Sequence, residues 1–148
     1  MTELFLADEA ATQVLGRKLA ASLRPGDALC LTGPLGAGKS TLARALIRAL
    51  TTPDEEVPSP TFTLVQFYET AGFPLAHFDL YRLSDPDEAY EIGLDEALDG
   101  GVALIEWPQR LEGRLPPTRL DIDIALDGDA RRAVIMRHGG FEGRDLEF

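Results

Sequence analysis

The segment from residue 33 to residue 41 has the residue types and spacing of a phosphate-binding loop. It fits the pattern of one glycine, four free positions and then Gly-Lys-Ser/Thr. Glycines let the backbone approach a polyphosphate closely, so that successive N–H groups surround an anion. Lysine at the seventh position can reach the β- and γ-phosphates, and the hydroxyl that follows can bind Mg²⁺. The predicted phosphate-binding residues are Gly33, Pro34, Leu35, Gly36, Ala37, Gly38, Lys39, Ser40 and Thr41.

The residues on either side of this loop predict the strand and the helix that such a loop requires. Residues 28–32 are a short apolar run, which is typical of a buried parallel strand. Apolar residues recur on one face of residues 42–50, which predicts a helix whose N-terminus adds positive potential at the loop. An ordinary glycine-rich turn is the alternative. It gives no reason for one of only two lysines, Lys18 and Lys39, to stand at this position.

Two acidic residues at the ends of predicted strands are candidates for the same site. In the stretch 101–108, four apolar residues are followed by Glu106, as in a strand whose last carboxylate holds Mg²⁺ directly or through water. Asp79 lies near the end of a strand predicted over 75–81 and is a candidate catalytic or magnesium-binding acid. In a doubly wound sheet such strands end beside the phosphate-binding loop. The structural alternatives are an exposed strand end for Glu106 and a capping role for Asp79.

Threonines at the start of another predicted strand could respond to the γ-phosphate. The segment Ser-Pro-Thr at 59–61 enters a strand predicted over 62–68, and either Thr61 or Thr63 could supply the sensing hydroxyl. Both could equally be ordinary β-branched strand residues. His77 shares a face with Asp79 on the next strand, and a structural role is the simpler interpretation for it.

Length and composition favour one domain over residues 1–148. The chain is 45% hydrophobic and 26% charged, and its net charge of −11 argues against independent nucleic-acid binding. No apolar run is long enough for a bilayer and the N-terminus lacks a signal peptide pattern, so the sequence predicts a cytoplasmic protein with no membrane contact. The single cysteine, Cys30, is expected in a buried strand.

The remaining elements predict an α/β fold with a mixed sheet. Residues 2–6 could form an edge strand, and Asp8 could cap a helix that runs to about residue 24. Residues 119–126 alternate in polarity and predict a strand that pairs with residues 132–136 in a hairpin. The polar, glycine-rich tail from 139 to 148 is expected to be partly mobile.

Four segments together resemble the TsaE (YjeE) family of bacterial tRNA threonylcarbamoyladenosine synthesis. They are the loop at 33–41, Ser-Pro-Thr-Phe-Thr-Leu-Val at 59–65, His-Phe-Asp-Leu-Tyr-Arg-Leu at 77–83 and Leu-Ile-Glu-Trp-Pro-Gln at 104–109. The resemblance implies a P-loop NTPase-like three-layer α/β/α sandwich with a mixed central sheet. It also implies ATP hydrolysis in an assembly with TsaD and TsaB, in which TsaD transfers the threonylcarbamoyl group to adenosine in tRNA.

The resemblance also assigns roles to residues of this chain. It implies that the loop binds the phosphates of ATP or ADP, with Lys39 and Thr61 among the catalytic groups. It implies Mg²⁺ at Ser40, where the family usually has threonine, and at Glu106, and a functional acid at Asp79. Nucleotide contacts are implied for Trp107, for Thr12 in the region 8–12, and for Arg132, with Arg131 as its alternative.

The predicted function is therefore a Mg²⁺-dependent ATPase, and it is slow alone because no arginine finger is evident. The main alternative is a small-molecule P-loop kinase, for which Arg110 and Arg114 are the only weak lid candidates. A GTPase switch is a further alternative, but the sequence lacks the Asn-Lys-x-Asp motif that recognises guanine. A nucleotide-dependent binding module with negligible hydrolysis is the last alternative.

Overall fold

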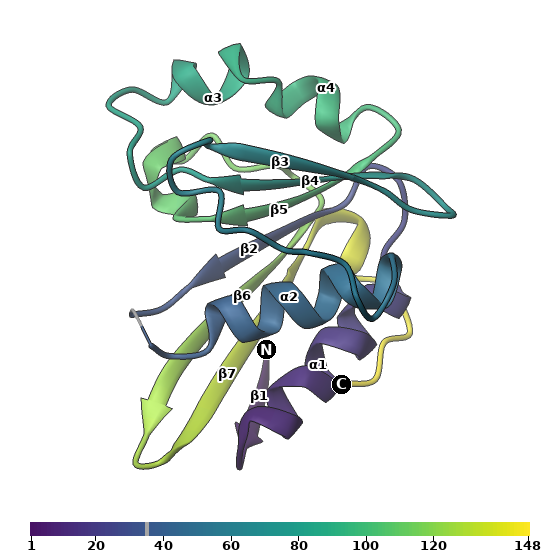
Figure 1. Ribbon diagram of the computed structural model, residues 1–148, viewed down its shortest axis with the longest axis vertical. Coiled ribbons are helices and arrows are strands. Elements are labelled where there is room, and N and C mark those ends of the chain that lie inside the picture. Colours follow the sequence, from purple (N-terminus) through teal and green to yellow (C-terminus); the bar gives the residue numbers. More distant parts are fainter. Residues whose placement is uncertain (35) are drawn as a thin grey trace.

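Seven strands form one mixed sheet in the order β1-β7-β6-β2-β5-β4-β3 (Figure 1). The computed structural model describes residues 1–34 and 36–148. The α/β class and the mixed sheet agree with the prediction. The strands are β1 (Thr2–Leu6), β2 (Ala28–Thr32), β3 (Val65–Glu69), β4 (Pro74–Asp79), β5 (Val102–Glu106), β6 (Arg119–Asp127) and β7 (Ala130–His138).

Parallel pairing in the centre of the sheet brings several strand ends to one edge. Strand β2 pairs in parallel with both β5 and β6, and β4 pairs in parallel with β5. The outer pairs, β3 with β4, β6 with β7 and β1 with β7, are antiparallel. The carboxyl ends of β2, β4 and β5 therefore meet at the edge where ligands bind in open α/β sheets.

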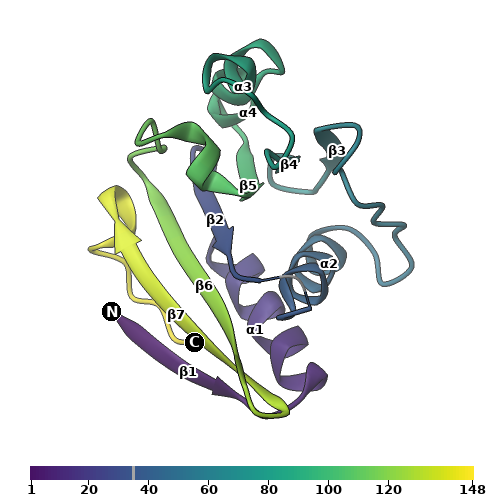
Figure 2. The ribbon, with the colours of Figure 1, turned by 90° about the vertical axis from the view of Figure 1, so that its left-hand side faces the viewer.

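Two helices cover one face of the sheet: α1 (Glu9–Ser22) and α2 (Lys39–Leu50) (Figure 2). Asp8 caps α1, as predicted, because its carboxylate accepts a hydrogen bond from the N–H of Ala11 at 2.9 Å. The two helices pack closely at Gly16, where an added Cβ would lie 2.7 Å from the Cβ of Ala45. Their apolar faces join side chains of β2, β6 and β7 in one core cluster.

The other face of the central strands is covered by α3 (Asp87–Glu91), α4 (Leu94–Leu98) and the 3-10 turn η1 (Pro108–Leu111). Buried Ala89, Leu94 and Leu111 from these elements pack against Phe78 of β4 and Ile105 of β5. Over β2, β5 and β4 the sheet thus lies between helices. None of the helices in the described ranges is long and apolar enough to cross a membrane.

One local prediction is wrong, and the tail forms contacts that its composition did not indicate. The strand expected from Phe62 begins instead at Val65, because the preceding residues form turns and Leu64 has a positive φ of 70°. Parts of the tail, which was expected to be partly mobile, contact the rest of the chain. Phe141 in η2 (Gly139–Phe141) is fully buried, and the Arg144 guanidinium forms two hydrogen bonds of 2.6 and 2.7 Å with buried Asp27.

Candidate functional site

The candidate site lies where the parallel strands end. The glycine-rich loop follows β2, Asp79 is the last residue of β4, and Glu106 is the last residue of β5. Asp79 and Glu106 are direct partners in the β4–β5 register, and Leu31 of β2 is the partner of Glu106. The sheet therefore places both predicted acids beside the loop.

Backbone conformation explains the glycines of the loop. Gly33, Gly36 and Gly38 have φ values of 140°, 79° and 106°, which disfavour any residue with a Cβ. At Gly33 there is also no space, because an added Cβ would lie 2.3 Å from the carbonyl oxygen of Ile124 in β6. Helix α2 begins at Lys39, directly after the loop. Leu35, which was predicted to bind phosphate, lies outside the described residues.

Lys39 is a nearly buried cation, with 7% of its surface exposed. Its Nζ lies 4.6 Å from the centroid of the Trp107 ring, and the ion pairs of the described residues do not include it. Trp107 itself has a positive φ of 59°, and its ring packs against that of Tyr81 at 4.8 Å. A buried cation that contacts an aromatic face but no carboxylate is suited to an anionic ligand.

The two acids are also largely buried but have different partners. Asp79 accepts a hydrogen bond of 2.9 Å from the Thr61 hydroxyl and one of 3.0 Å from the backbone N–H of Tyr81. Ser59 extends this network through a 2.8 Å contact with Thr61. Glu106 instead contacts Nε2 of His77 at 2.7 Å. The Thr61–Asp79 bond fixes the segment before β3 against the strand end.

The structure separates the two candidate threonines. Thr61 lines the cavity beside Asp79, whereas Thr63 is exposed and its hydroxyl accepts a hydrogen bond from Gln66 at 3.1 Å. Of the two, Thr61 is placed to meet a ligand.

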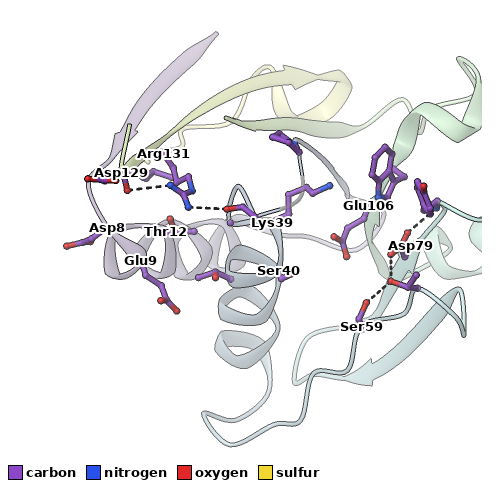
Figure 3. A pocket seen from close by; sticks show the side chains of 18 residues that line it. Asp8, Glu9, Thr12, Lys39, Ser40, Ser59, Asp79, Glu106, Asp129 and Arg131 are labelled. Carbon is purple, nitrogen blue, oxygen red and sulfur yellow. Dashed lines mark hydrogen bonds between the residues drawn. The ribbon is translucent and has the colours of Figure 1, made fainter. Parts of the chain in front are cut away.

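A cavity of about 620 Å³ brings these groups together (Figure 3). Lys39 lies between two ends: Asp79 and Glu106 line one, and Asp8 and Arg131 line the other. Of the predicted residues, those that line the cavity are Thr12, Pro34, Gly36, Gly38, Lys39, Ser40, Thr41, Thr61, Asp79, Glu106 and Trp107. Gly33 and Ala37 do not line it: Ala37 is fully buried in the core, and Gly33 packs against β6.

Arg132 does not reach the cavity; its neighbour Arg131 does. Arg132 pairs with Glu3 at 2.8 Å and with Asp127 at 2.7 Å on an exposed surface. Arg131 donates a hydrogen bond of 3.0 Å to the carbonyl oxygen of Gly36 in the loop. Successive strand residues point to opposite faces, so the sequence could have distinguished the two arginines only if the register of the hairpin were known.

Sequence reasoning missed several lining residues at both ends of the cavity. Tyr81 could have been found, because it lies two residues after Asp79 and carries an aromatic ring beside the predicted site. Asp129 carried no signal, since a turn between two strands gives no indication of which cavity it borders. The missed lining residues are Leu6, Ser59, Tyr81 and Asp129.

Comparison with known proteins identifies the family. The family model described as "Threonylcarbamoyl adenosine biosynthesis protein TsaE" matches residues 6–134. The chain belongs to the TsaE family. This confirms the resemblance inferred from the sequence motifs.

Individual relatives agree with the family match. The TsaE protein of Rickettsia felis is 40% identical over 145 residues, which cover 98% of this chain and 85% of the relative. The Bacillus subtilis TsaE protein is 41% identical over 124 residues, covering 83% and 77% of the two chains. The crystal structure of Bacillus subtilis YdiB superposes with a TM-score of 0.76 at 32% identity, covering 95% of this chain and 88% of the other.

Proposed function

We propose that this TsaE-family chain is a Mg²⁺-dependent ATPase that supports threonylcarbamoyl transfer to adenosine in tRNA by a complex of TsaD and TsaB. We further propose that residues 1–148 form one P-loop NTPase-like domain, a three-layer α/β/α sandwich. The observation that carries the proposal is the cavity at the carboxyl edge of the sheet. It combines a buried cation, Lys39, with two largely buried carboxylates, Asp79 and Glu106.

The side chains present fit a magnesium–nucleotide ligand. Lys39 lies at the start of α2 without a carboxylate partner among the described residues, so a phosphate would supply the missing negative charge. Glu106 and the Ser40 hydroxyl are oxygen donors on the wall of the same cavity. Within the described ranges no three His, Cys, Asp or Glu side chains form a metal cluster. That suits Mg²⁺, which is commonly held by one or two protein ligands together with phosphate and water oxygens.

We infer that catalysis proceeds mainly by positioning and charge. Water attacks the γ-phosphate in line, while Lys39 and the loop amides hold the phosphate oxygens. Ser40 and Glu106 would hold Mg²⁺, which neutralises charge on those oxygens when it is bound. Asp79 lies where it could orient the attacking water, and Thr61, bonded to Asp79, would respond to the γ-phosphate.

The opposite end of the cavity is the proposed site of the base. Thr12 and Arg131 line that end, and Arg131 is hydrogen-bonded to the loop carbonyl of Gly36. Arg131 is the one arginine among the described lining residues, and its guanidinium is already hydrogen-bonded to the carbonyl oxygen of Gly36. We therefore expect no free arginine finger from the described lining residues, in keeping with slow hydrolysis that partners stimulate. A net charge of −11 supports indirect contact with tRNA through the complex.

The test measures ATP hydrolysis with and without TsaB, TsaD and tRNA, for the wild type and for Lys39→Ala. The other lysine of the chain, Lys18, is exposed on α1, so Lys18→Ala is a matched control for loss of one positive charge. We expect partner-stimulated turnover that falls about 100-fold or more in Lys39→Ala and is unchanged in Lys18→Ala. Turnover that is equally fast without partners, and that rises with a small phosphate acceptor, would instead identify a small-molecule kinase.

A further inference from the structure

His77 is a buried histidine directly behind the proposed magnesium site. Only 3% of its surface is exposed, and it does not line the cavity. It lies on β4 two residues before Asp79, so both side chains project from the same face of the sheet. In the β4–β5 register His77 is opposite Leu104, which makes Glu106 its diagonal neighbour on that face.

The only polar contact of the His77 ring within the described residues is with Glu106. Its Nε2 lies 2.7 Å from Oε2 of Glu106, while the buried Nδ1 has no hydrogen-bond partner there. A buried polar atom without a partner costs roughly 1–3 kcal/mol, so an imidazole is a poor choice for simply filling this space. The contact with Glu106 is what distinguishes histidine from an apolar residue here.

The contact restricts the Glu106 carboxylate. A glutamate side chain has three rotatable bonds, and an unrestrained one would reach a metal in only some of its conformations. With Oε2 held by the ring, the remaining oxygen of Glu106 is left for a ligand in the cavity. Groups that fix a metal-binding side chain in this way typically contribute 10–100-fold to metal affinity or activity.

We propose that His77 is a positioning residue for the magnesium-binding carboxylate. Its Nε2–H donates to Oε2 of Glu106 and holds the carboxylate in the orientation that binds Mg²⁺–ATP. The inference rests on the proposed function, because it assumes that Glu106 is a metal ligand.

The test compares two amide substitutions that differ only in reach. The Nε2 of glutamine is as many bonds from the backbone as Nε2 of histidine, so His77→Gln can still donate to Glu106. The amide of His77→Asn is at the level of Nδ1 and cannot reach. His138→Leu is the control, since His138 is the other histidine of the chain and lies 2.9 Å from the carboxylate of Asp121 away from the cavity.

The first measurement is the affinity for a fluorescent ATP analogue with and without Mg²⁺. We expect the gain in affinity that Mg²⁺ provides to fall about 10-fold or more in His77→Asn, to be largely kept in His77→Gln, and to be unchanged in His138→Leu. Affinity without Mg²⁺ should be the same in all four proteins. The Mg²⁺ concentration for half-maximal ATPase activity should rise in the same order, and thermal unfolding confirms that each variant is folded.

The possible outcomes separate this inference from the proposed function. A Mg²⁺ response in His77→Asn equal to that of the wild type would overturn the positioning role. So would an equal loss in the asparagine and glutamine variants, because the reach of the donor would then not matter. If the wild type itself neither binds ATP in a Mg²⁺-dependent way nor hydrolyses it, the proposed function fails first.

Discussion

Two neighbouring regions of the sheet differ in how far they expose polar side chains to water. The inner region, β2, β5 and β4, has helices on both faces, and its strands are almost continuously buried. The outer region, β6, β7 and β1, has α1 and α2 on one face, and buried and accessible residues alternate along its strands. Few polar side chains are tolerated in the first region, whereas the second places many of them in water.

The two regions also differ in their ion pairs: those of the outer region are at least partly accessible to water. In the outer region Arg132 pairs with Glu3 and Asp127 at exposed positions, and Asp121 pairs with Arg119 and lies close to His138 at partly buried ones. Exposed pairs such as those of Arg132 contribute little to stability. At the end of the inner region the polar side chains are buried. They are Lys39, His77, Asp79 and Glu106.

A charged side chain that is buried without an ion pair is a candidate for a role in ligand binding. Removing a charge from water is costly, and in a folded chain the cost persists only where the group is paired or used. Lys39 and Asp79 are both buried yet form no ion pair within the described chain. The contrast between the regions therefore supports the proposed role of the inner acids, whereas most outer acids lie in accessible ion pairs.

The strongest test of this contrast replaces one acid in each region. We expect Glu106→Gln to lower the turnover of ATP about 100-fold, because it removes the charged oxygen that faces the proposed metal. Its thermal stability should be equal to or higher than that of the wild type, since a buried charge is removed. Glu3→Gln, at an exposed ion pair, should leave turnover unchanged. Steady-state ATPase assays and thermal unfolding check both expectations, and full activity of Glu106→Gln would remove this residue from the site.

A second test uses two adjacent arginines that lie on opposite sides of β7. We expect Arg131→Ala to weaken ATP binding by about 10-fold, since a charge-assisted hydrogen bond to the loop carbonyl contributes roughly 1.5–3 kcal/mol. Arg132→Ala removes exposed ion pairs with Glu3 and Asp127, so nucleotide affinity should not change. Equilibrium binding of a fluorescent ATP analogue compares the two. A larger loss in Arg132→Ala would mean that the outer face of the hairpin takes part in binding.

The sequence predicted the inner region and its site more completely than the outer region. The loop, Asp79 and Glu106 could be placed because each follows an apolar run, and parallel strands must end at a common edge. Those predictions needed only the local pattern and one rule of topology.

What sequence reasoning could not supply depends on register and on distant packing. Choosing Arg131 over Arg132 requires the alignment of β7 with its neighbours, which periodicity alone does not determine. The contact of His77 with Glu106 requires the β4–β5 register in the same way. The tail was expected to be partly mobile from its polar composition, and that composition gave no sign of the contact between Arg144 and Asp27, more than a hundred residues earlier in the chain.

The smallest expected effect concerns the boundary between the regions, at Cys30 in β2. This residue is opposite Asp121 of β6, and burial, followed by the charge of Asp121, raises the pKa of its thiol to about 12. Because the thiolate is the reactive form, we expect native protein at pH 8 to react with a thiol reagent far more slowly than protein unfolded in guanidinium.

The same raised pKa makes stability depend on pH. The contribution of Cys30 to the free energy of unfolding is constant below the ordinary pKa of 9.0. It falls as pH rises toward 12, since the unfolded thiol loses its proton first. Cys30→Ala should lack this loss, as measured by denaturant unfolding at pH 8 and 10. Rapid labelling of the native protein would mean that β2 and β6 separate easily, and that the boundary is less rigid than the site beside it.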